Sequence, residues 1–140
     1  MMFNWPLLDY RVISSDFGTR IHPVTGAKQF HNGVDIPCPE GTPVLAPCDG
    51  TVLSVWLDEK FGGGLSLSLE VRRKGVDRFG FAHLSKVCVA KGDKVKRGQV
   101  VAYSGGLPGL PESGKSTGPH LHMTVKCDGL ALDPSDLLWV

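Results

Sequence analysis

This sequence has no long apolar run, no paired cysteine motif and almost no net charge. Its 140 residues contain no stretch near the ~18 apolar residues that a membrane-spanning helix needs. None of the four cysteines belongs to a Cys-x-x-Cys pair, which argues against a zinc-finger pattern. The formal net charge is +1, with short and interrupted basic clusters. We therefore expect no transmembrane segment and no nucleic-acid partner.

The N-terminal residues also show no secretory signal. Residues 1–6 have no basic region followed by a long apolar one, so we expect a chain made without a signal peptide. The cysteines, at positions 38, 48, 88 and 127, are predicted to be free buried thiols. A disulfide between Cys38 and Cys48 is the alternative, because both flank the same turn-rich segment.

Sustained helical periodicity is missing too, and the pattern is typical of an all-β protein. The 18 glycines and 10 prolines are spread along the whole chain and separate short strand-like runs. Residues 65–71 alternate strictly, which predicts one buried and one solvent-exposed face. We predict a single all-β domain with long loops, little helix and one helical turn at 134–138. The predicted strands are 44–46, 50–56, 65–72, 78–83, 99–103 and 120–126.

Two further features concern the loops. Residues 41–52 and 92–101 share an order of Gly, turn, Val and Gly, which suggests two related β-hairpin units. Residues 105–118 hold five glycines and two prolines and are expected to form a long loop. Long loops in compact domains are usually functional.

The pair His120 and His122 carries the clearest chemical signal. Residues two apart on a strand point to the same face, so both imidazoles converge on one region. A second cluster is His31-Asn32-Gly33-Val34-Asp35, where an extended strand would put His31 and Asp35 on one face. Gly33 between them would leave room for an ion.

These residue types suit a catalytic zinc site. Imidazole and carboxylate groups bind Zn²⁺, and three protein ligands leave a fourth position for water. One histidine of the pair at 120 and 122 would complete the set, and spacing alone does not decide which. The other histidine and His83 are candidates for proton transfer and oxyanion stabilisation, whereas His22 is given no catalytic role.

The sequence resembles the M23 zinc endopeptidases, the lysostaphin and LytM type, from about Ser14 to Leu138. The resemblance rests on motifs in matching order: Phe17 to Gly26, His31 to Ile36, Gly41 to Val44, Ala82 to Ser85, Val95 to Gln99 and Ser116 to His122. It implies one Zn²⁺ per chain, held by His31, Asp35 and His122, with His83 and His120 as catalytic residues. It also implies a fold of antiparallel β-sheet, a sandwich-like domain of the LytM type (duplicated hybrid motif), over residues 14–140, preceded by an extension over residues 1–13.

The resemblance further implies hydrolysis of peptide bonds in bacterial peptidoglycan through a zinc-activated water. Both D-Ala to meso-diaminopimelate cross-links and glycine bridges are substrates in this family. The loop around Gly106, Lys115 and Thr117 is expected to line the substrate groove. We expect action at the cell wall or periplasm, and a phage-type hydrolase released by lysis or carried on a virion fits the bare catalytic domain.

Two alternatives stay open at this point. A carrier or binding module of biotinyl, lipoyl or IIA type would share the hairpin units. A biotinyl or lipoyl carrier needs a lysine between apolar residues at a hairpin tip, which this sequence lacks, and a IIA-type phosphocarrier leaves Asp35 unexplained. A non-catalytic LytM-like protein would instead activate another wall enzyme. The sequence does not indicate the oligomeric state.

Overall fold

The computed structural model describes residues 2–140, and the expected all-β fold with antiparallel sheets is confirmed. The regular elements of the described residues are strands and two 3₁₀ turns, η1 (Pro111–Ser113) and η2 (Pro134–Asp136). The second turn falls where a helical turn was predicted. No helix within this range is long and apolar enough to cross a membrane.

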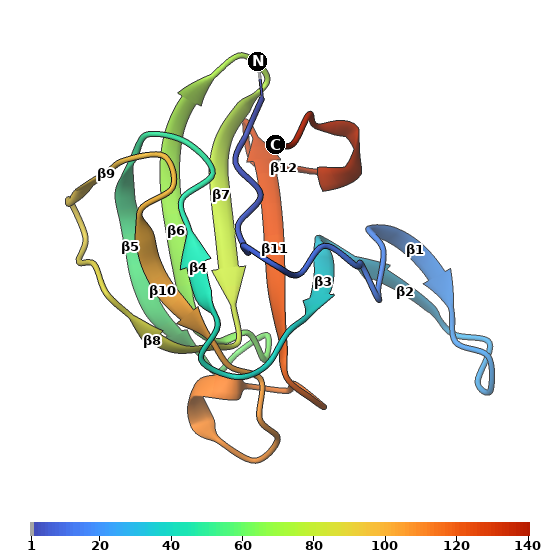
Figure 1. The fold of residues 1–140 in the computed structure, drawn as a ribbon. Helices are drawn as coiled ribbons and strands as arrows, with labels where there is room; N and C mark the ends of the chain where they lie inside the picture. The colour runs from blue at the N-terminus through green and yellow to red at the C-terminus, as the bar shows by residue number, and fades with distance from the viewer. Residues whose placement is uncertain (1) are drawn as a thin grey trace.

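The largest sheet has seven strands and carries the long central elements. Its order is β12-β11-β7-β6-β5-β9, and β3 pairs with β11 beside this path. All neighbours are antiparallel, and the sheet curves through the body of the molecule (Figure 1). The strands are β3 (Val34–Pro37), β5 (Gly50–Asp58), β6 (Gly64–Arg73), β7 (Val76–Ala82), β9 (Lys94–Val95), β11 (His120–Cys127) and β12 (Leu130–Leu132).

A smaller three-stranded sheet, in the order β4-β10-β8, packs against the large one. It comprises β4 (Pro43–Leu45), β8 (Leu84–Val87) and β10 (Val100–Ser104). Apolar side chains of both sheets form one buried cluster, with Val44 and Val101 from the small sheet and Leu67, Leu69 and Phe79 from the large one. This sandwich leaves the opposite face of the large sheet free for a site.

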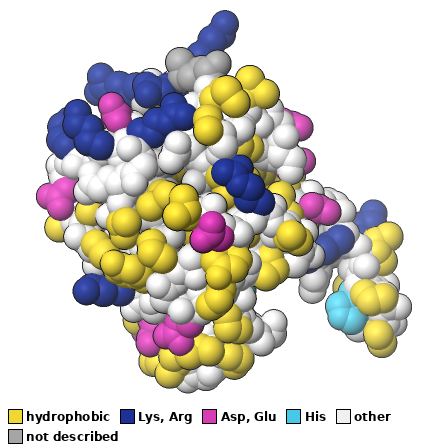
Figure 2. Space-filling model, in the orientation of Figure 1, with side chains coloured by type: hydrophobic (Ala, Val, Ile, Leu, Met, Phe, Trp, Pro, Cys, Tyr) yellow, Lys and Arg dark blue, Asp and Glu magenta, His cyan; other side chains and the backbone are white. Residues whose placement is uncertain are grey.

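A two-stranded hairpin of β1 (Gly18–Ile21) and β2 (Lys28–His31) projects from this body (Figure 1). Figure 2, in the same orientation, shows histidine on the projecting hairpin and none over the body of that face. The other imidazoles therefore do not reach the face that carries the small sheet.

Residues 41–52 and 92–101, which share the order of Gly and Val, are related in how they pair, but neither forms a hairpin. The prediction of two β-hairpin units is therefore wrong. β4 pairs with β10, and β5 pairs with β9, so each segment exchanges its strands with the other. Their turns also bond to each other, since the Ala46 and Val52 amides donate to the Gln99 and Asp93 carbonyls. Exchange lets each short strand pair in a separate sheet, which a local hairpin would not allow.

The strand β6 departs from the predicted alternation. Glu70 is exposed, as expected for the polar face, but Ser66 and Ser68 are only 3% and 4% exposed. Both hydroxyl-bearing residues lie on the face opposite the core. The two serines line a groove on this face, and its walls bury them where a flat sheet would leave them exposed.

The cysteines are free thiols, and no bond joins Cys38 to Cys48. Cys38 and Cys48 are buried as predicted, whereas Cys88 is exposed and Cys127 is half-buried.

Residues 3–7, within the segment expected to be an extension, pack onto the domain. Phe3, Trp5 and Leu7 are buried, and the Phe3 amide and carbonyl bond to residues Leu138 and Val140.

Candidate metal centre

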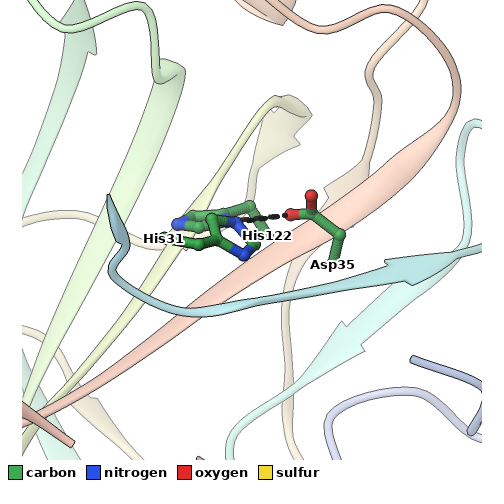
Figure 3. A group of neighbouring side chains, drawn as sticks. All are labelled: His31, Asp35 and His122. Carbon is green, nitrogen blue, oxygen red and sulfur yellow. Dashed lines mark hydrogen bonds and ion pairs between the residues drawn. The ribbon is translucent and has the colours of Figure 1, made fainter. Parts of the chain in front are cut away.

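The structure brings His31, Asp35 and His122 together at the edge of the large sheet (Figure 3). His31 is the last residue of β2, Asp35 lies in β3 and His122 lies opposite Asp35 in β11. The backbone of Ser15 bonds to the other edge of Asp35. Three segments distant in sequence are thereby fixed side by side. The predicted single strand over 31–35 is wrong, because residues 32 and 33 form a corner between β2 and β3.

The donor atoms of these three side chains are spaced as a tetrahedral zinc site requires. Asp35 Oδ1 lies 2.9 Å from His122 Nδ1 and 3.5 Å from His31 Nε2, and the two nitrogens are 3.3 Å apart. Bonds of about 2.0–2.1 Å at tetrahedral angles give ligand separations of about 3.3–3.4 Å. Nitrogen and carboxylate oxygen are also the donors that zinc prefers among those present. The residues therefore fit a zinc ion.

Hydrogen bonds on the far side of each ring fix which nitrogen faces this centre. His31 Nδ1 lies 2.9 Å from the Asp16 carbonyl, and a carbonyl oxygen only accepts, so Nδ1 carries the proton. His122 Nε2 lies 3.0 Å from Oδ1 of Asn32, which leaves the Nδ1 lone pair toward Asp35. Sequence reasoning missed the role of Asn32. Only its place next to His31, in a corner that folds back on β11, brings it to the ring.

Gly33 has a different role from the one predicted. A Cβ atom at this position would lie 2.1 Å from the Met123 carbonyl oxygen and 3.1 Å from Cε1 of His122. The missing side chain therefore allows the corner to approach the backbone of β11, and the space is filled by that strand rather than by an ion.

His120 and His83 face the same centre from the other side. Nε2 of His120 lies 3.5 Å from Asp35 Oδ1, and the ring centroids of His83 and His120 are 4.9 Å apart. Each ring donates its Nδ1 proton to a carbonyl at 2.7 Å, that of Gly118 for His120 and that of Ser113 for His83. In both residues Nε2 is thereby free to exchange a proton within the site.

The backbone of His83 is held in an unusual conformation. Its φ is 56°, in the left-handed region that residues other than glycine seldom adopt. The His83 amide donates to the Gly63 carbonyl at 2.8 Å, and the ring donates to Ser113. Two loops thus clamp this residue, and such strain is common at functional sites.

The charges of the centre favour a cation. Burial raises the pKa of the Asp35 carboxyl, but His122 and His31 within bonding distance outweigh it and hold that pKa well below its usual range. The contact with Asp35 raises the pKa of His31, partly opposed by burial. Burial lowers the pKa of His83, partly opposed by its bond to Ser113. The field that favours a protonated His31 would equally favour a metal ion among the donors.

A groove crosses the large sheet beside these residues. Lys115 and Thr117 of the long loop line this groove, whereas Gly106 is buried and does not, and their expected contact with substrate stays a prediction. His22 lies in the β1–β2 turn, where its Nδ1 accepts the amides of Val24 and Thr25, in keeping with its exclusion from the site.

Comparison with known proteins supports a peptidase. The model of peptidase family M23 matches residues 29–134. The peptidoglycan DD-endopeptidase ShyB of Vibrio cholerae is 40% identical over 117 residues, which are 83% of this chain and 25% of that protein. The chain spans about a quarter of the length of the first curated relatives it matches.

Solved structures agree. A zinc-containing peptidase from Vibrio cholerae superimposes with a TM-score of 0.82 at 38% identity, covering 95% of this chain and 39% of that one. The catalytic domain of lysostaphin from Staphylococcus simulans has a TM-score of 0.72 at 33% identity, covering 91% of both chains.

Proposed function

The chain belongs to peptidase family M23, and from this premise we propose that it is a zinc-dependent endopeptidase that hydrolyses peptide bonds in bacterial peptidoglycan. One observation carries the proposal. Three donor atoms have separations of 2.9, 3.3 and 3.5 Å, matching a zinc tetrahedron, and two further imidazoles present free Nε2 atoms beside them.

The proposed ligands are His31, Asp35 and His122, with one ion per chain. Zinc, when bound, would polarise the scissile carbonyl and lower the pKa of a water molecule to near 7. The protein's own part is to hold the ligand rings by their outer hydrogen bonds and to keep Asp35 ionised between them.

We propose His83 and His120 as the catalytic residues for proton transfer. With Nδ1–H fixed on a backbone carbonyl, each Nε2 can accept a proton from the attacking water or donate one to the leaving amine. A protonated imidazole here would also stabilise negative charge on the carbonyl oxygen. The geometry supports this pair of roles without assigning one role to each residue.

The place of action follows from the substrate. Relatives named for peptidoglycan hydrolysis support the cell wall or periplasm as the location. We propose that the protein reaches the wall by phage lysis or on a virion, and the genes that neighbour its own would test this route.

Digestion of purified sacculi, with mass spectrometry of the released fragments, tests the proposed function. The zinc-loaded protein should release peptides, and His83→Ala or His120→Ala should abolish release while one equivalent of zinc is retained. His31→Ala and Asp35→Ala should lose the metal. Loss of zinc from either catalytic variant would contradict the assigned roles, and intact sacculi with bound zinc would favour the non-catalytic activator.

A further inference from the structure

The groove continues past the metal centre along β7 and β11, over a floor of small side chains. One face of β11 carries His122, Thr124 and Lys126. Their cross-strand partners on β7 are, in the same order, Ala82, Gly80 and Arg78. Ser68 of β6 lies opposite Gly80 and also lines this groove. Ala82, Gly80, Thr124 and Ser68 are all small, so the floor leaves a channel between His122 and the basic pair Arg78 and Lys126.

Ser68 provides an unexplained polar group in this floor. The residue is 4% exposed, and its hydroxyl has no hydrogen-bond partner within residues 2–140. A buried hydroxyl without a partner costs free energy, so such groups call for a ligand or another explanation. Its position in the groove floor points to a polar ligand above β6 and β7.

The charge at this end is positive. Arg78 and Lys126 are direct cross-strand partners, an arrangement of like charges that is destabilising by itself. Glu70 also lies opposite Arg78, yet no described carboxylate comes within 4 Å of either basic group. An anion bound between Arg78 and Lys126 would remove their repulsion.

The carboxylates of the groove are already engaged. Asp58 accepts the amides of Phe61 and Gly63 and so holds the β5–β6 loop. Asp35 belongs to the metal centre. Against these two, the groove carries four basic side chains, Arg20, Arg78, Lys115 and Lys126. Its charge therefore complements an acidic peptide.

We propose that Ser68, Thr124, Arg78 and Lys126 form a subsite for a carboxylate of the peptide substrate. The inference rests on the proposed function and refines it. Of the two substrate classes, glycine bridges carry no side-chain carboxylate, whereas diaminopimelate cross-links do. The subsite favours the second class.

The distance is compatible with one peptide reaching both places. Lys126 lies four positions after His122 on β11, a span of about 13 Å at the rise of an extended strand. A peptide in extended conformation covers that span in about four residues. The recognised carboxylate therefore lies within about four residues of the bond that is cleaved.

Two cross-linked peptides that differ only at the diaminopimelate carboxylate, free in one and amidated in the other, test the subsite. For the zinc-loaded protein we expect kcat/KM to favour the free carboxylate about tenfold to a hundredfold, mainly through KM. In R78Q/K126Q the two values should converge. R78K/K126Q should regain part of the preference that R78Q/K126Q loses, because it restores one of the two charges.

A matched control removes the same charge elsewhere. Arg72, near the end of β6, and Lys74, in the β6–β7 turn, are exposed and do not line this groove, so R72Q/K74Q should keep the full preference. Equal cleavage of both peptides by the unaltered protein would overturn the subsite and leave the proposed function intact. Binding titrations of the same peptides decide the question without turnover: if neither is cleaved, the proposed function fails, and equal affinities would still overturn the subsite.

Discussion

Asn32 shows how a single exposed side chain can decide what a histidine does. The Asn32 amide oxygen receives Nε2–H of His122, so the ring presents the Nδ1 lone pair to the metal centre. Without this acceptor the ring can rotate or change tautomer, and Nδ1 is no longer fixed toward Asp35. The ligand set then remains in the sequence but loses its preorganisation.

Asn32→Ala should therefore weaken zinc binding by about tenfold to a hundredfold. The side chain is exposed, so the fold should be unaffected. A competition titration against a chromophoric chelator measures the zinc Kd directly. Asn32→Asp keeps an acceptor oxygen and should restore most of the affinity. Gln29→Ala, an exposed change on β2, is the control, and an unchanged Kd in Asn32→Ala would refute the role.

Residue types and the family resemblance together predicted which side chains meet at this centre, whereas their supports could not be predicted. Short sequence motifs contain all five side chains, and their imidazole and carboxylate groups indicate a metal site with acid–base residues: His31, Asp35, His83, His120 and His122. Their outer partners are backbone carbonyls of Asp16, Ser113 and Gly118, and a carbonyl carries no sequence signal. Only the path of the chain decides which carbonyl meets which ring.

At the scale of elements, two loops act together as a clamp on His83. The β5–β6 loop offers the Gly63 carbonyl and the loop at 105–118 offers the Ser113 carbonyl. The loops touch through glycine backbones: a Cβ on Gly114 would lie 2.2 Å from the Gly62 carbonyl oxygen. The Lys115 amide donates to the same oxygen at 2.9 Å.

Gly114→Ala should separate these loops and misplace His83. We expect kcat to fall up to about a hundredfold, since displacements near 1 Å can cost that much. Zinc content should not change, because no proposed ligand lies in either loop. Steady-state kinetics with metal analysis checks both statements.

Gly109→Ala is the matched control for this change. Gly109 lies in the same loop with a φ of 84°, but a Cβ there would meet nothing within 4 Å. Both variants place an alanine at a positive φ, and only Gly114→Ala breaks the loop contact. Equal kcat values in the two variants would show that the contact does not position His83.

Sequence patterns predicted where the longer strands lie, but they did not predict how the strands pair. Alternation and turn residues located the cores of β5, β6, β7, β10 and β11. The exchange of β4 and β9 between sheets depends on contacts far apart in sequence, which local patterns do not encode. The same holds for Ser66 and Ser68, whose burial depends on the groove walls.

At the scale of the whole molecule, the two ends of the chain close one edge of the core. The rings of Trp5 and Trp139 pack edge to face, with centroids 5.1 Å apart. The rings of Phe3 and Phe79 pack in the same way, with centroids 5.2 Å apart. The termini lie near each other in Figure 1, away from the loops of the site. The segment before Ser14 thus contributes to stability at a distance from the chemistry.

Removal of residues 2–7 should therefore destabilise the domain and leave the site chemistry unchanged. Three buried side chains, at about 1.5–3 kcal/mol each, amount to a large part of the stability of a small domain. Thermal unfolding of the zinc-loaded protein should show a markedly lower Tm. Trp5→Ala should reproduce part of the loss, about 3–5 kcal/mol, while Leu8→Ala, 76% exposed in the same segment, should not. A chain starting at Ser14 with an undiminished Tm would instead support the boundary predicted after residue 13.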